Sequence, residues 1–226
     1  LPSVLNASIF TKIRYQKTNG EEASGARTTN TGEFQFPDEF ALMFAGRVAE
    51  NVGFWLEGQI ADPSMPLVAS FKMPFVFNVG GIKAGLIPFS TDGLGVAYGY
   101  ELLNTGAVAN MRGLEHGGDL SAQLYIGTDS AAEGLAVVAR NERFFANFSA
   151  WSPNHAASAM GQENGAPTMQ YLRLGTTPAV AGWDLGAGLQ WWGGEASAND
   201  MTPMLMRYKA NAWAMDAQMQ GDVSGM

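Results

Sequence analysis

The sequence predicts an all-β fold: a transmembrane, antiparallel, up-and-down β-barrel of about twelve strands, either complete in this chain or part of a larger barrel. Apolar residues alternate with polar or small ones along many segments, which is the period-two pattern of strands with two different faces. These segments are about ten residues long, the length of a tilted strand that crosses a bilayer. Charged residues make up only 15% of the 226 residues, yet no apolar run reaches the ~18 residues of a membrane helix. No linker or composition shift divides the chain, so we expect one domain over residues 1–226.

The alternation is clearest between Glu39 and Ile60, where a short break at residues 50–51 separates two apolar runs. Such a pair of runs predicts a β-hairpin whose two arms share one apolar face. The alternating residues are Phe40, Leu42, Phe44, Gly46, Val48, Val52, Phe54, Leu56, Gly58 and Ile60. Pro37 has no amide hydrogen, so the ladder of the first arm should begin after it or form a bulge there.

The N-terminal strand, residues 5–15, has the cleanest alternation of polar and apolar residues. Lys12 and Arg14 share the face opposite its apolar residues. Against lipid, each cation would cost about 2–4 kcal/mol near the bilayer centre. We therefore expect both side chains to face a wet interior or carboxylate partners.

Later segments repeat the design with varying clarity. Further strands are expected at residues 67–77, 82–86, 94–103, 120–126, 135–140, 144–150, 169–174, 181–191 and 204–212. In residues 169–174 the pattern leaves the two faces undecided. Trp183 and Trp191 should lie near opposite ends of one strand, at the two aromatic girdles of such a barrel.

The strand at residues 94–103 is predicted by counting. These barrels keep short turns on the periplasmic side and long loops outside, and without this crossing the later turns would be reversed. The alternative is a loop folded into the barrel. The outward residues of the strand would be Val96, Tyr98, Tyr100 and Leu102. The turns expected on the periplasmic side are residues 49–52, 78–81, 141–142 and 177–179, and the outside loops are 18–32, 152–167 and 192–203.

The candidate binding residues are charged side chains on the non-apolar parity of their strands, which should line the lumen. They are Lys12, Arg14, Arg47, Glu57, Lys72, Lys83, Arg140, Asp184, Arg207 and Lys209. A basic belt in a narrow lumen would concentrate anions. The alternative is that these cations pair with the listed carboxylates or with loop carboxylates and only satisfy the interior.

Other chemistry has little support in the sequence. Without cysteine, the chain cannot form disulfides, thiolate metal sites or covalently attached haem. His116 lies near Glu115 and Asp119, and His155 near Ser152, Asn154 and Ser158, but we interpret both groups as solvated loops. We expect no catalytic residue and no metal ligand. A net charge of −8 argues against nucleic-acid binding.

The segment FPDEFALMFAGRVAENVGFWLEGQI, residues 36–60, resembles the early barrel strands of a bacterial outer-membrane porin family in which a small monohaem cytochrome domain is fused to the barrel. The resemblance implies an outer-membrane location and a role in electron transfer. That family's haem motif contains cysteine, so no haem-binding residue is carried over. A haem would have to come from an upstream segment or a c-type cytochrome partner.

Three functions follow from these observations. The first is an outer-membrane pore or scaffold, not an enzyme, for passive passage of small solutes, anions if the basic belt forms. The second is the porin sheath of an electron-transfer system. The third is a secreted soluble β-sandwich that binds glycans through Trp151, Trp191 and Trp192. Membrane lipid is the partner expected in the first two, and the sequence leaves the solute and the oligomeric state open.

Overall fold

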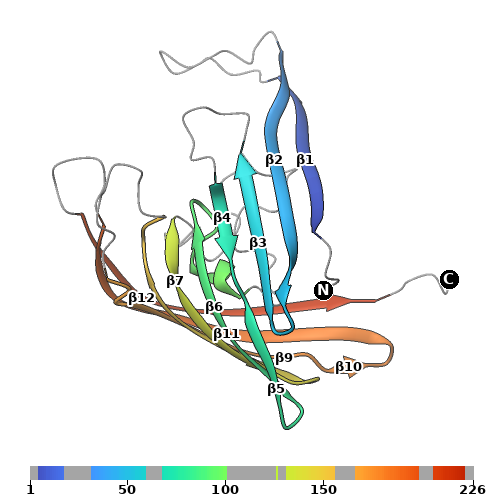
Figure 1. The fold of residues 1–226 in the computed structure, drawn as a ribbon, viewed down its shortest axis with the longest axis vertical. Coiled ribbons are helices and arrows are strands. Elements are labelled where there is room, and N and C mark those ends of the chain that lie inside the picture. The colour runs from blue at the N-terminus through green and yellow to red at the C-terminus, as the bar shows by residue number, and fades with distance from the viewer. Residues whose placement is uncertain are drawn as a thin grey trace.

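A computed structural model describes residues 5–17, 32–59, 68–100, 126, 131–155, 166–198 and 206–221. Within them the chain forms one antiparallel twelve-stranded sheet in which most neighbours are consecutive in sequence (Figure 1). The strands are β1 (Asn6–Gln16), β2 (Glu33–Ala49), β3 (Val52–Gln59), β4 (Val68–Lys72), β5 (Phe75–Val79), β6 (Ile82–Thr91), β7 (Ala132–Arg140), β8 (Phe144–Ser152), β9 (Met169–Thr176), β10 (Ala179–Val180), β11 (Trp183–Ala198) and β12 (Met206–Gln220). The all-β, up-and-down prediction is confirmed. In this part of the chain no helix has the length and apolar character needed to cross a membrane.

Two pairs of strands continue each other. β4 and β5 both pair with β3 and β6, and β9 and β10 both pair with β11. The twelve strands therefore make ten passes across the sheet. Among the described residues, β1 pairs with β2 and β12 pairs with β11, and no ladder joins β1 to β12.

The connections are asymmetric, as predicted. The β2–β3, β5–β6, β7–β8 and β10–β11 turns are short and lie at one end of the sheet, and the longer connections between passes start from its opposite end. The last short turn is Ala181–Gly182, not residues 177–179 as the sequence suggested. Both of its residues adopt positive φ, 52° and 82°, which suits a two-residue hairpin turn. β11 also continues to Ala198, where a loop was expected from Trp192 onward.

The predicted strand at residues 94–103 is wrong. Residues Val96–Gly99 form a short 3-10 helix, η1, and residues 101–103 lie outside the described part of the chain. Tyr98, expected to face outward, is 2% exposed and contacts Phe89 and Trp55. Burial of this aromatic ring outweighs the weak alternation, so the segment folds onto the sheet as the alternative had it. The predicted strand at residues 120–126 lies outside the description apart from Ile126.

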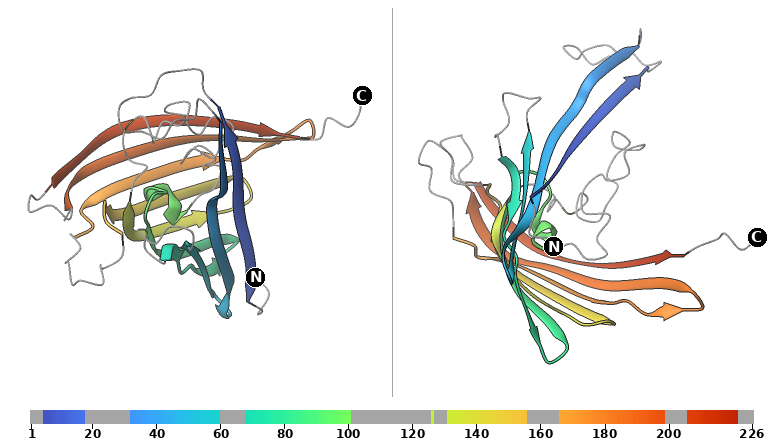
Figure 2. Two further views of the ribbon diagram at one scale, coloured as in Figure 1. Left: turned by 90° about the horizontal axis from the view of Figure 1, so that it is seen from above. Right: turned by 45° about the vertical axis from the view of Figure 1, so that its right-hand side comes forward.

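The sheet curves around η1, which gives it a concave and a convex face (Figure 2). Ladder partners lie on the same face, so the register assigns each strand's faces. Most predicted outward residues of β1 to β8 are on the convex face, as Ile9 pairs with Leu42 and Phe148 with Leu172. Ala69 is an exception: it lies at a register shift of β4, where Val68 pairs with Gly58, and it is buried. Most large apolar side chains that remain exposed are there, including Ile9, Ile13, Phe71, Phe77, Leu86, Val137, Phe144, Leu189, Trp213, Met215 and Met219.

The core lies on the concave face. Its buried members include η1 and the aromatic residues Phe89, Trp151, Tyr171 and Trp192. The bulge predicted at Pro37 is confirmed, because the β1–β2 register shifts between Lys12 and Arg14, opposite this proline. The sheet is thus one layer with a packed concave side and an apolar convex side.

Candidate binding site on the concave face

A buried polar network occupies the concave face of β9, β11 and β12. The Arg173 side chain is fully buried, and its Nη2 donates to Asp216 Oδ1 at 2.5 Å. Gln190 Nε2 donates to Asp216 Oδ2 at 2.6 Å, and Tyr171 Oη donates to Gln190 Oε1 at 3.0 Å. The Arg173 guanidinium also lies 5.6 Å from the centre of the Phe145 ring. These contacts neutralise the one buried cation on this side of the sheet among the described residues.

Glycines in the neighbouring strands make room for this network. A Cβ at Gly188 would lie 2.7 Å from Asp216 Oδ2, and one at Gly175 would lie 2.2 Å from the Phe145 ring. Gly188 and Gly175 are ladder partners, so they leave a shared recess between β9 and β11. The recess explains why small residues interrupt the alternation of these strands.

A second feature is a basic cavity of about 350 Å³ between η1 and the concave face of β4 to β7. Its charged lining consists of Lys72, Lys83 and Arg140, and Tyr100 closes it from the η1 side. Lys72 Nζ donates to the Tyr98 carbonyl at 2.9 Å and lies 4.3 Å from the centre of the Tyr98 ring. Burial raises the pKa of the Tyr100 phenol, although its hydrogen bond to Arg140 acts in the opposite direction.

The predicted basic belt is present only in part. Lys12, Arg14, Arg47, Lys72, Lys83 and Arg140 are on the concave parity of their strands, as are Glu57 and Asp184. They do not form a ring at one height: Arg47 lies near the β2–β3 turn, whereas Lys12 and Arg14 are toward the other end of β1. Among them, the cavity unites only the cations of β4, β6 and β7.

Arg207 and Lys209 correct the prediction for β12. Lys209 pairs across the ladder with Glu195, and its Nζ lies 3.0 Å from the Glu195 carboxylate on the convex face, where both side chains are exposed. The concave side of β12 here is Tyr208, Ala210, Ala212 and Ala214, which pack against the core. Small residues are needed beneath Trp192, so the polar residues of this half-strand face outward.

His155 is not part of the Ser–His–Asn group that its loop suggested. Its Nδ1 is 2.9 Å from Ser90 Oγ on β6, and its Nε2 is 2.9 Å from the Val68 carbonyl. Ser152 and Asn154 instead bond each other. Because a carbonyl only accepts, Nε2 donates to the Val68 carbonyl, and the imidazole joins β4, β6 and the end of β8. Ser158, His116, Glu115 and Asp119 lie outside the described residues, within which no group of three metal-ligating side chains occurs.

The glycan platform proposed for the soluble alternative is not formed. Trp191 is on the convex face, whereas Trp192, its neighbour, is fully buried on the concave face. Trp151 is also buried, at 2% exposure. Sugar-binding aromatic rings must be accessible on one surface, and these three indoles are not.

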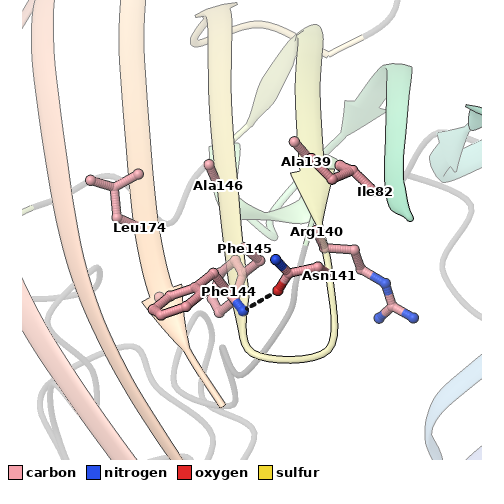
Figure 3. Close-up of a pocket in the computed structure, with 9 residues that line it drawn as sticks. Ile82, Ala139, Arg140, Asn141, Phe144, Phe145, Ala146 and Leu174 are labelled. Carbon is pink, nitrogen blue, oxygen red and sulfur yellow. Dashed lines mark hydrogen bonds between the residues drawn. The ribbon is translucent and has the colours of Figure 1, made fainter. Parts of the chain in front are cut away.

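The convex face has a shallow apolar depression of about 400 Å³ between β6 and β9 (Figure 3). Ile82, Ala139, Phe144, Ala146 and Leu174 line it. In Figure 3 the Arg140 side chain points away from Phe144 and Leu174. The depression is therefore mainly apolar, and Arg140 and Asn141 border it at the end of β7.

Arg173 and Asp216 are not among the candidate binding residues that the sequence predicts. Arg173 lies in the strand whose faces the alternation left undecided, because Leu172 and Leu174 flank it in a short segment that also contains Tyr171. Asp216 lies beyond the last predicted strand, which ended at residue 212, whereas β12 continues to Gln220. The alternation of Trp213, Met215 and Met219 was the signal available for that extension.

The chain matches no family model, no curated protein and no solved structure. The resemblance of residues 36–60 to cytochrome-fused porins therefore stays a prediction.

Proposed function

We propose that this chain is an outer-membrane β-barrel protein whose narrow interior holds and passes small anions. The observation that carries the proposal is the exposure of large apolar side chains on the convex face of a single-layer sheet. Soluble proteins rarely leave apolar patches of this extent uncovered, whereas the outer wall of a membrane barrel requires them.

The convex surface of β11 and β12 fits the thickness of a bilayer. Trp183 and Trp191 lie on this face eight residues apart, about 27 Å along the strand. With the tilt of about 40° usual in such barrels, the distance across the membrane is about 20 Å, close to the apolar band of ~25 Å. Beyond Trp191, which contacts Trp213 at 6.1 Å between ring centres, the same face carries the Glu195–Lys209 ion pair. Aromatic rings followed by charges are typical of the edge of the lipid-contacting band.

Closure belongs to the proposal as well. In lipid, the backbone groups of β1 and β12 need partners, and a barrel supplies them by joining the two strands. The concave side then becomes the interior, where η1 reduces the open cross-section and Lys72, Lys83 and Arg140 give a positive potential.

Two measurements test the proposal. In vesicles with brominated acyl chains, the tryptophan fluorescence of the protein should be quenched. Trp213 is 63% exposed and Trp192 is buried, so Trp213→Phe should remove a larger part of that quenching than Trp192→Phe. In planar bilayers under a KCl gradient, the reversal potential should have the sign of chloride preference. Equal quenching in both variants, or cation preference, would contradict the proposal. A haem absorption band in protein purified from its native membrane would favour the electron-transfer alternative.

A further inference from the structure

The basic cavity beneath η1 has the properties of a ligand site. It measures about 350 Å³, within the size range of small-molecule pockets, and lies on the concave face between η1 and the strands. Lys83 and Arg140 are direct ladder partners in it. Like charges opposite each other across an antiparallel ladder are destabilising, so an anion bound between Lys83 and Arg140 would stabilise this pair.

No described residue lining the cavity provides that anion. The lining contains no aspartate or glutamate, and Arg140 binds the Tyr100 hydroxyl, which is neutral at physiological pH. Lys72 is oriented by the Tyr98 carbonyl and ring. The Arg173–Asp216 and Lys209–Glu195 ion pairs are in other strands. The positive charge of Lys83 and Arg140 is thus available to a ligand.

The rest of the lining indicates which kind of anion fits. Pro74, Val76, Ile87 and Val138 give the cavity apolar walls, and Tyr100 adds an aromatic surface. A small inorganic anion would leave these walls without contacts, whereas an organic anion would fill them. An arginine beside a lysine suits a carboxylate, because the guanidinium offers two parallel N–H donors.

We propose that the cavity between η1 and strands β5 to β7 binds a small organic carboxylate, with the carboxylate between Lys83 and Arg140 and the apolar body against Val76, Ile87 and Val138. The site rests on the proposed function for its role, since it would hold a carboxylate on its way through the interior. The binding itself needs only the folded chain.

Benzoate is a suitable probe, because it joins one carboxylate to an apolar ring. Isothermal titration of the purified, detergent-folded full chain should show one benzoate per chain. Benzamide, which has the same shape without charge, should bind at least tenfold more weakly, and inorganic phosphate should also bind more weakly. Raising the salt concentration should weaken benzoate binding.

Two variants locate the site. Arg140→Gln and Lys83→Gln should each raise the dissociation constant at least tenfold, whereas Lys209→Gln, which removes the same charge on the convex face, should leave it unchanged. No benzoate binding, equal binding of benzamide, tighter binding of phosphate, or equal effects of Lys209→Gln and Lys83→Gln would each overturn the assignment. Bilayer conductance is measured separately. Anion conduction without benzoate binding would contradict the carboxylate site and leave the proposed function standing. Benzoate binding without conduction would contradict the proposed function and leave the site standing.

Discussion

Loss of the Asp216 carboxylate should destabilise the fold strongly, because this carboxylate is the charge partner of the fully buried Arg173. Asp216→Ala removes the acceptor of both Arg173 Nη2, at 2.5 Å, and Gln190 Nε2, at 2.6 Å. Breaking a buried ion pair from one side costs about 3–5 kcal/mol. The Asp216 side chain is 25% exposed, so water can replace part of the loss, and we expect a cost near 3 kcal/mol.

The double variant provides the decisive comparison. Arg173→Met keeps an unbranched side chain beside Phe145 but removes the charge, so Arg173→Met/Asp216→Ala no longer buries a cation in that position. It should be more stable than Asp216→Ala alone, by about 1–2 kcal/mol. Urea unfolding from lipid vesicles, followed by tryptophan fluorescence, measures the free energy of unfolding of each variant. A double variant that is as unstable as the sum of its single variants would refute the assignment of a coupled ion pair.

Three further changes test other parts of the structure. Leu56→Arg, on the convex face, should lower the free energy of unfolding in vesicles by about 2–4 kcal/mol, whereas Gln59→Arg, on the concave face, should have little effect; equal losses would contradict the faces assigned to β3. Burial raises the pKa of the Asp92 carboxyl in the folded protein, so ionisation of Asp92 opposes folding once the pH exceeds the pKa that this carboxyl has in the unfolded chain. Asp92→Asn should therefore stabilise the protein at pH 7 but not below pH 3, and a stability loss at pH 7 would contradict this. The chain has no cysteine, so the double variant Ile9→Cys/Met215→Cys places one thiol on β1 and one on β12. If β1 and β12 close the barrel, a bismaleimide should link the two thiols within one chain. Links only between chains would argue against this closure.

The strands of the first half were predictable because one physical requirement dominates each of them. In β2 and β3, the convex residues are apolar, so the period of two runs from Phe40 to Val48 and again from Val52 to Gly58. The turn positions followed from the breaks between runs. Lys12 and Arg14 were placed on the concave parity by the cost of a charge in lipid, and the register agrees.

Where two requirements compete, the alternation fails. In β12 the convex face changes from Lys209 and Asn211 to Trp213 and Met215, while the concave face needs alanine beneath Trp192. The polar parity therefore changes sides within one strand, and no period-two rule follows it. The segment at residues 94–103 failed for another reason. Its alternating tyrosines pack on the inner face as part of a short helix, and the count of crossings had relied on a strand at residues 120–126 that lies outside the description.

The two sides of the concave face differ in how their cations are compensated, and this difference determines what each side can do. Arg173 is matched by Asp216 within the protein, so that side is electrically complete and contributes stability. Lys83 and Arg140 face each other across the ladder, and no carboxylate lines their cavity among the described residues, so that side stays positive. In the proposed barrel, a neutral, packed wall opposite a positive one would direct an anion along β5 to β7, because the field would be strongest there. Variants at Asp216 should therefore change stability, whereas variants at Lys83 should change anion affinity and selectivity, and the two properties should separate in one set of measurements.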